Sequence, residues 1–295
     1  MVLYLHQKKQ ESCDEWDYVI SGKEAVPVVF AYLQYAELLL QENKIGKAVE
    51  VLESGFRNYP GNRDILYTLL PVLFYTGDME KSIMYVQHLP DGFEKDQYVM
   101  KLLCAVGQFE SAYKIGQKWR QKLSTEMLKN KNIQPFWQNY VNCLIFLEKT
   151  QELKEEAEKY LQVYPDDLMI LNGAGYVFAD LNIHLDLAET YLKKARKLQP
   201  DSAAIADSLA WLYHRQGKVE DAKMEIFQAL ILMDSELNVE ILEHAGDILM
   251  SGGNSQAAAG YWEMALSALG NVPEDHEQKQ RLQRKIKGVT GDQSV

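Results

Sequence analysis

Large apolar residues recur along this chain at helical spacing, and small residues interrupt them at fixed places. Three stretches near the C-terminal end can be aligned on one another: residues 168–202, 203–236 and 239–272. Each has a small residue among large apolar ones, then a turn, then the order Ala, large residue, Ala. The pattern returns after about 34 residues, the period of a helix–turn–helix repeat. Alternation typical of β-strands is absent over any useful length, so the pattern predicts an all-α chain.

Within each repeat the residue types have a packing role. If the inner small residue is position 8, it is Gly175, Ala210 and Gly246 in the three stretches, and position 24 is large, as in Trp262. Two antiparallel helices cross closely only where a small side chain faces a large one. Position 15, occupied by Gly217 in the middle stretch, marks the turn between the two helices.

The earlier part of the chain repeats this order less regularly. Units are expected at 29–62, 63–92, 93–126 and 134–167, which gives seven units over about four-fifths of the chain. We expect the second helix of the third unit to be unusually long, from Phe109 to Leu128, and a seam to follow it in the sequence KNKNIQP at 129–135.

The matched positions resemble the tetratricopeptide repeat family, whose pattern of W, LG, Y, A, F, A and P is met at most places here. The resemblance implies a right-handed α-solenoid superhelix of about seven units with a C-terminal capping helix. The fifth to seventh units are also similar to the closing repeats of bacterial tetratricopeptide proteins, several of which are exported as outer-membrane lipoproteins. This favours a bacterial source.

The expected organisation has five parts. Residues 1–28 are an N-terminal cap or the remnant of an upstream repeat, 29–128 hold units 1–3, and 129–272 hold units 4–7. A capping helix follows at 273–288, where Leu282 and Ile286 could cover the last unit and the basic residues are expected to face solvent. Residues 289–295 are expected to be a disordered tail.

Composition and charge limit the kinds of binding partner and the cellular location that the sequence predicts. The chain has 31 Lys and Arg against 42 Asp and Glu, a net charge of −11, which argues against binding to a nucleic-acid backbone. No apolar run is long enough for a membrane span. The start MVLYLHQKKQ does not read as a signal peptide, so we expect a cytoplasmic protein. The alternative is a periplasmic or outer-membrane-associated protein whose N-terminus is truncated here.

No motif indicates catalysis. A GxxxxGK[ST] loop and a GxSxG elbow are absent, and HEQKQ at His276 lacks the second histidine of a zinc-protease helix. The cysteines, Cys13, Cys104 and Cys143, form no CxxC motif, and we expect no disulfide framework. His244 is interpreted as a hydrogen-bonding residue between successive first helices, with Asp207 within reach, rather than as a metal ligand. We therefore predict a protein that is not an enzyme and has no cofactor or metal.

The expected functional surface is the concave groove, which the family resemblance places on the first helix of each unit. Asn and Gln there suit a peptide backbone, and exposed aromatic rings suit a binding hot spot. Positions 2, 5, 9, 12 and 13 give the candidate residues Tyr67, Phe74, Tyr75, Gln138, Asn142, Phe146, Asn172, Tyr176, Asp180, Asp207, Trp211, His214, Arg215, Glu243 and Asp247.

These residues predict a scaffold or adaptor that binds a peptide or a partner helix. Towards the C-terminal end the candidate surface is acidic, with Arg215 as its single fixed positive charge, so a basic or polar protein partner is expected rather than an acidic one. Two alternatives stay open. The array could be the regulatory or substrate-docking portion of a larger protein or enzyme complex, and a homodimer could form through end units.

Overall fold

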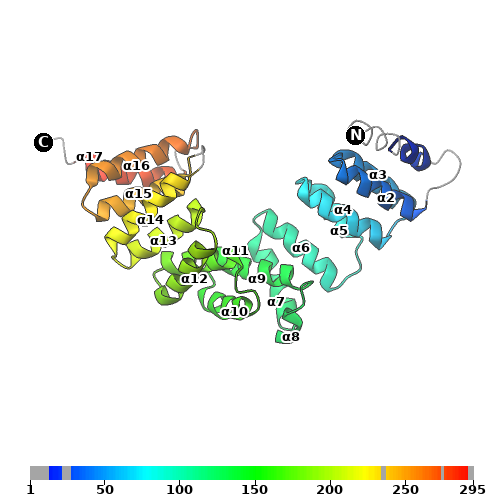
Figure 1. Cartoon of the computed structure of the whole chain (residues 1–295), viewed down its shortest axis with the longest axis horizontal. Coiled ribbons are helices and arrows are strands. Elements are labelled where there is room, and N and C mark those ends of the chain that lie inside the picture. Colours follow the sequence, from blue (N-terminus) through cyan, green and yellow to red (C-terminus); the bar gives the residue numbers. More distant parts are fainter. Residues whose placement is uncertain (1–12, 22–27, 234–236, 274–275, 292–295) are drawn as a thin grey trace, which may run out of the picture. The chain divides into compact units, whose positions relative to one another are not determined.

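The computed structural model describes residues 13–21, 28–233, 237–273 and 276–291, and these residues form helices and no strand. The chain is an all-α solenoid of helical hairpins, as the sequence predicts (Figure 1). No helix in these ranges is long and apolar enough to cross a membrane.

Seven helical hairpins follow one another in the described residues, and the first helix of each begins where its sequence repeat begins. The hairpins are α2 (Val29–Gln41) with α3 (Ile45–Asn58), α4 (Arg63–Tyr75) with α5 (Met79–Val86), α6 (Phe93–Ala105) with α7 (Phe109–Arg120), α9 (Gln134–Phe146) with α10 (Thr150–Val163), α11 (Leu168–Asp180) with α12 (Leu185–Leu198), α13 (Ala203–Arg215) with α14 (Val219–Leu232), and α15 (Val239–Ser251) with α16 (Ser255–Ala268).

The chain divides into two compact units, Met1–Leu128 and Lys129–Val295. The first holds the hairpins from α2 to α7 and the short helix α8 (Thr125–Leu128). The second holds the hairpins from α9 to α16 and the last helix, α17 (Glu277–Thr290). In the first unit the core joins residues of α2, α3 and α4, among them Tyr35, Leu52 and Leu69.

The turn inside every hairpin has a residue with positive φ at position 15, and the turn between α11 and α12 has a second one, His184. A left-handed conformation reverses the chain direction in three residues, and glycine adopts it without a steric cost from Cβ. Four units use glycine there, whereas the other three use a residue with a side chain. The residues are Asn43, Gly77, Gly107, Glu148, Asn182, Gly217 and Gly253.

The small residues lie where the packing pattern requires them. A Cβ added to Gly175 would stand 2.7 Å from Cγ of Leu192, the large residue of the facing helix. A Cβ on Gly55, which takes the place of the last alanine in the first unit, would stand 2.8 Å from the ring of Tyr32. Only a residue without a side chain lets the two helices approach this closely.

The expectation of one long helix from Phe109 to Leu128 is wrong. Helix α7 ends at Arg120, whose guanidinium donates to the carbonyl oxygen of Leu123 at 3.3 Å. Ser124 then begins α8, since its hydroxyl accepts a hydrogen bond from the backbone N–H of Met127 at 3.3 Å. A serine cap of this kind starts a new helix instead of continuing the old one.

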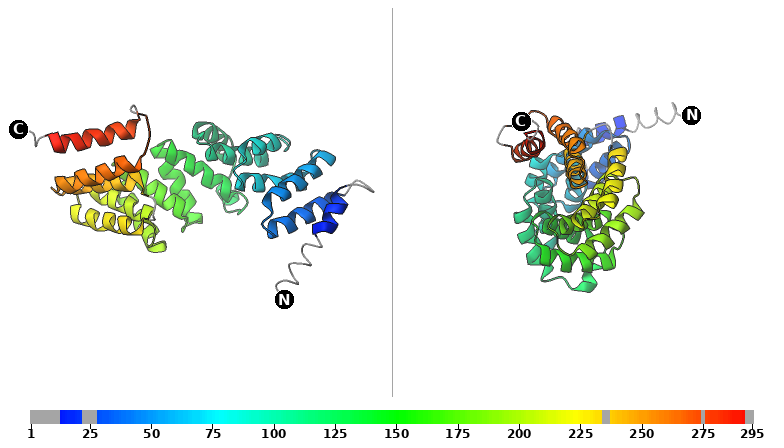
Figure 2. Two further views of the ribbon diagram at one scale, coloured as in Figure 1. Left: turned by 90° about the horizontal axis from the view of Figure 1, so that it is seen from above. Right: turned by 90° about the vertical axis from the view of Figure 1, so that its left-hand side faces the viewer.

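The ends of the described chain are helical. Residues 13–20 form a helix that packs on the first hairpin, where the Trp16 ring stacks on Tyr35 at 6.3 Å between centroids. The part of the expectation for residues 1–28 that concerns residues 1–12 and 22–27 lies outside the described residues. Helix α17 runs alongside α16 (Figure 2) and buries Leu282 completely against the cluster around Trp262. Because α17 continues to Thr290, residues 289 and 290 are helical rather than part of a disordered tail.

Candidate functional site

The first helices of the second unit, joined by α17 at the third pocket, line a set of three pockets that share residues. The pocket nearest α9 measures about 350 Å³ and the next about 340 Å³, and both are lined by Phe146 and Asn172. The third measures about 1050 Å³ and shares Tyr176 and Glu240 with the second. We call these three pockets together the inner channel.

Most candidate residues of this unit contribute to the channel walls. Those that line it are Asn142, Phe146, Asn172, Tyr176, Asp180, Asp207, Trp211, Glu243 and Asp247. Gln138, His214 and Arg215 are not among the lining residues. Gln138 donates to the Asp167 carboxylate at 2.9 Å, and Arg215 lies over the Trp211 ring at 5.9 Å.

The three remaining candidates belong to the other compact unit. Tyr75 has 78% of its surface exposed. Lys101 places its ammonium 3.8 Å from the centre of the Phe74 ring. Burial, together with a hydrogen bond to Glu94, raises the pKa of Tyr67 to about 12. None of these three candidates lines the pockets of the channel.

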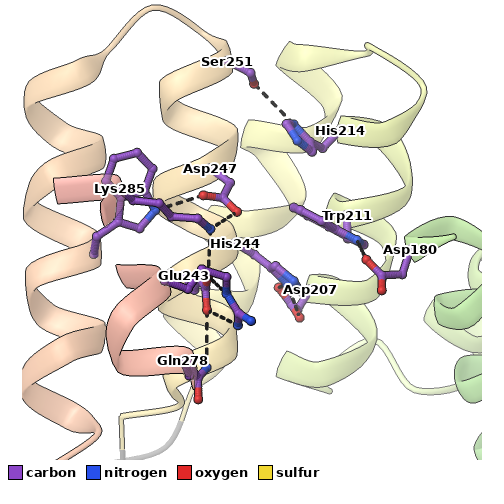
Figure 3. Close-up of polar contacts among 12 residues, drawn as sticks. Asp180, Asp207, Trp211, His214, Glu243, His244, Asp247, Ser251, Gln278 and Lys285 are labelled. Carbon is purple, nitrogen blue, oxygen red and sulfur yellow. Dashed lines mark hydrogen bonds and ion pairs between the residues drawn. The ribbon is translucent and has the colours of Figure 1, made fainter. Parts of the chain in front are cut away.

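The indole of Trp211 lines the third pocket of the channel. His244 stacks on this ring at 4.1 Å with an interplanar angle of 16°, and His214 stacks on it at 4.9 Å and 26°. The indole N–H donates to Asp180 at 2.9 Å (Figure 3). Trp211 is therefore held by both rings and by a hydrogen bond, and these contacts fix the orientation of the indole.

The two histidines of this stack have opposite electrostatic environments. His244 is buried and its Nδ1 lies 2.9 Å from Oδ1 of Asp207, the hydrogen bond between successive first helices that the sequence predicts. Burial alone would lower the pKa of His244, but the charge and hydrogen bond of Asp207 outweigh it and raise the pKa. Burial lowers the pKa of His214.

Two further carboxylates of the channel are bonded to neutral donors. Asp180 accepts from the indole of Trp211, and Glu240 accepts from the hydroxyl of Tyr176 at 2.7 Å. Burial, followed by this hydrogen bond, raises the pKa of Tyr176, so the phenol stays protonated and donates. Neither contact neutralises a negative charge, and this part of the channel is acidic.

The sequence predicts Arg215 as the single fixed positive charge near the acidic residues, and this prediction is wrong. Arg281 of α17 makes two hydrogen bonds to the Glu243 carboxylate, at 2.6 and 2.8 Å. Lys285 bridges Glu243 and Asp247, with both distances 2.7 Å. Burial would raise the pKa of Glu243, but Arg281 and Lys285 outweigh it and lower it to about 2.

The sequence of α17 explains these ion pairs. Arg281 and Lys285 are four residues apart and therefore share a helix face, next to the buried Leu282. The α17 sequence taken by itself predicts that this basic helix face lies in solvent. The acidic position Glu243 on α15, taken together with this basic pair, was the signal for the ion-pair cluster.

The opposite end of the channel is more apolar. Phe146 exposes 59% of its surface there, beside Ile145. Oδ1 of Asn172 is buried and has no hydrogen-bond partner in the part of the chain that the structure describes. An unpaired amide oxygen is costly unless a donor reaches it, which makes Asn172 a candidate contact for a ligand N–H group.

The channel walls combine aromatic, amide and carboxylate side chains. Within the described ranges, no group of three or more His, Cys, Asp or Glu side chains is arranged to hold a metal ion. The titratable side chains at the centre are engaged with one another, as His244 is with Asp207 and Glu243 with Arg281.

Comparison with known proteins agrees with this architecture. A family model described as "Tetratricopeptide repeat" matches residues 182–236. A TPR repeat-containing protein of Pseudomonas aeruginosa is 34% identical over 217 residues, which cover 74% of this chain and 30% of that protein. The chain thus spans less than a third of the length of this relative.

Solved structures share the fold at low identity. A tetratricopeptide repeat protein from Parabacteroides merdae superposes with a TM-score of 0.61 at 16% identity, covering 89% of this chain and 98% of that one. A TPR protein of Thermus thermophilus gives 0.50 at 18% identity, covering 65% of this chain and 98% of that one. Together with the seven hairpins and their close-packed small residues, these matches show that the chain belongs to the tetratricopeptide repeat family.

Proposed function

We propose that this protein is a non-catalytic scaffold whose inner channel binds an extended segment of a partner protein. The observation that carries the proposal is the continuity of the three pockets along the first helices, with exposed Phe146 at one end and the Trp211 stack at the other. Solenoid proteins use such surfaces for binding, and members of this family generally mediate protein–protein interactions.

The polar groups of the channel support a peptide rather than a compact ligand. The buried amide oxygen of Asn172 lacks a donor, and a peptide N–H is a donor that an extended chain presents at regular intervals. Asn142 lies in the same pocket and can both donate and accept. The flat face of Phe146 then offers contact area for a side chain of the segment.

The charges support a basic or polar segment over an acidic one. Asp180 and Glu240 are bonded to neutral donors, whereas Glu243 and Asp247 are compensated by cations of α17. We therefore place the preference for a ligand cation near Asp180 and Glu240, and not along the whole acidic surface. The net charge of −11 also disfavours nucleic acid as the partner.

A second candidate is a docking portion within a larger protein. The observation that favours it is the length of the Pseudomonas aeruginosa relative, of which the matched region covers 30%. In that case the inner channel would either hold a bound segment for a neighbouring part of the same protein or regulate that neighbouring part. The binding chemistry would be unchanged, and the two candidates differ in the origin of the segment.

The proposal is tested by selecting peptides from a random display library on the whole chain and measuring the affinity of an enriched peptide by calorimetry. We expect Phe146→Ala and Asn172→Ala each to weaken binding about 10-fold, the effect of losing one central contact. Tyr75→Ala, an exposed aromatic of the other compact unit, is the matched control and should bind as the unaltered protein does. Equal affinity for all three variants would contradict the channel as the site.

A further inference from the structure

The outward face of α14 has an apolar stripe that the solenoid does not need. Met224, Phe227 and Ile231 expose 61%, 41% and 73% of their surfaces. Their spacing of three and four residues places them on one side of the helix. The buried side of α14 is formed by other residues, Ala222, Ile226 and Ala229. The stripe is therefore additional to the packing of the repeat.

The repeat itself provides the comparison that makes this stripe unusual. Met224, Phe227 and Ile231 stand at positions 22, 25 and 29 of their unit, and the same positions of the neighbouring units are small or polar. On α10 they are Glu155, Glu158 and Gln162, on α12 they are Thr190, Lys193 and Lys197, and on α16 they are Gly260, Glu263 and Ser267. A solvent-facing helix side is normally polar, so an exposed apolar one marks a contact surface.

The helices beside α14 carry charges of opposite sign. Arg196 of α12 bonds Glu225 of α14 at 3.1 Å, which fixes α12 on one side. Tyr261 of α16 packs against the same apolar cluster as Leu230 of α14, which fixes α16 on the other. The stripe thus lies between two exposed lysines of α12, Lys197 and Lys193, and exposed Glu263 on α16. Lys193 also pairs with Glu189 of its own helix at 2.5 Å.

We propose that this surface, the outer face of α14 with its α12 and α16 borders, is where a second copy of the chain binds. A two-fold axis that lies in the interface parallel to α14 pairs the stripe with itself. The same rotation exchanges the two borders, so Lys193 and Lys197 of one copy face Glu263 of the other, twice per dimer. An isologous contact requires this kind of self-complementarity.

The mixed charge of the two borders favours a second copy of the chain over other binding partners. An anionic membrane surface would attract the lysines of α12 but repel Glu263 and, on α14 itself, Glu220, whose side chain is 86% exposed. A strongly charged protein of either sign would likewise meet one unfavourable border. A second copy satisfies both borders at once and covers the apolar residues. The contact area is that of a few helices, which predicts a weak dimer.

Sedimentation equilibrium of the whole chain between about 5 and about 300 µM tests the proposal, since a small interface gives dissociation constants of about 10 to 100 µM. We expect a monomer–dimer equilibrium that Phe227→Glu and Ile231→Glu each weaken at least about 10-fold. Gln162→Glu, at position 29 on α10, is the matched control and should leave it unchanged. Circular dichroism checks that each variant is folded, which the exposure of these side chains leads us to expect.

The geometry of the axis is tested by charge reversal. Glu263→Lys should weaken the dimer, and combining it with Lys193→Glu and Lys197→Glu should restore it, because the exchanged borders attract again. A chain that stays monomeric at the highest concentration would overturn the proposal, as would a dimer that survives Phe227→Glu. Dimerisation and peptide binding in the inner channel are measured separately, so the failure of one leaves the other standing.

Discussion

Gly246 and Trp262 meet so closely that the indole occupies the place of a side chain at position 246. A Cβ added to Gly246 would stand 2.2 Å from Nε1 of Trp262. That nitrogen donates to the carboxylate of Asp247 at 3.0 Å, so the ring cannot move away without losing a hydrogen bond. The contact joins α15 to α16 and holds the last hairpin together.

Gly246→Ala should therefore destabilise the protein by about 2 kcal/mol, the usual cost of overpacking a well-filled core. The measurement is the free energy of unfolding from a urea titration. Gly260→Ala is the matched control, because Gly260 also lies in a helix of this hairpin but has nothing within 4 Å of an added Cβ. It should stabilise by about 0.5 to 1 kcal/mol through helix propensity. Equal effects of the two substitutions would contradict the packing explanation.

A second prediction concerns the turn of the hairpin formed by α9 and α10. Glu148 has φ of 50°, where the other units place glycine or asparagine at the same position. The left-handed conformation costs a residue with Cβ about 1 to 2 kcal/mol, and part of this is offset by the greater flexibility of glycine in the unfolded chain. Glu148→Gly should raise the stability by about 0.5 to 1 kcal/mol in thermal or urea unfolding.

Two substitutions serve as controls for the turn. Glu148→Ala removes the carboxylate but keeps Cβ, so it should leave the free energy of unfolding nearly unchanged. Gly217→Ala makes the reverse change at the equivalent turn, where φ is 72°, and should destabilise by about 1 kcal/mol. If Glu148→Ala stabilised as much as Glu148→Gly, charge and not backbone conformation would be the cause.

The stack of two histidines on Trp211 gives a third prediction. Titration of the imidazole protons by NMR should show His244 with a pKa above its ordinary value of 6.5 and His214 with a pKa below it. Asp207→Asn should bring the pKa of His244 below 6.5, because burial remains while the charge that opposes it is removed. His214 should change little in this variant.

These shifts also fix the sign of the pH dependence of stability. The contribution of His244 is present below pH 6.5 and is lost as the pH rises through its raised folded-state value. The contribution of His214 is present above pH 6.5 and is lost as the pH falls through its lowered value. Asp207→Asn should therefore remove the loss of stability on the alkaline side. A variant whose stability still fell above pH 6.5 as in the unaltered chain would exclude His244 as the source.

The sequence was sufficient for the hairpins because their determinants are local. Gly175 and Gly246 mark the positions where two helices cross, and Gly217 marks the position where the chain turns. The break at Leu123 was missed because the apolar spacing of α7 continues past it, and only the cap at Ser124 separates the two helices. Helix periodicity is a weaker guide to helix ends than to helix existence.

The candidate site was predicted less completely, and the reason is distance along the chain. Residues within one helix, such as Asn172 and Tyr176, follow from position in the repeat. The partners of Glu243 come from α17, 38 and 42 positions further on, and no spacing rule within the repeat links them. The sequence indicates which residues share a helix face but not which face a terminal helix covers.

The contact between α17 and α15 gives the last prediction. Glu243→Gln should destabilise the protein by about 2 to 4 kcal/mol, because it leaves Arg281 and Lys285 without the buried carboxylate that they surround. Arg281→Gln should cost less, since Lys285 still reaches Glu243, and a double-mutant cycle should give a coupling of about 1 to 3 kcal/mol. Lys194→Gln, which breaks an exposed ion pair with Asp166, is the control and should stay within about 0.5 kcal/mol.

Acid titration of the same contact has a defined direction. The pKa of Glu243 lies at about 2, below its ordinary value of 4.5. Its contribution is therefore complete above pH 4.5 and disappears as the pH falls towards 2. Between these values the stability of Glu243→Gln should fall less steeply with pH than that of the unaltered chain. Parallel curves would mean that α17 is held by Leu282 and its apolar neighbours, with the ion pairs adding nothing.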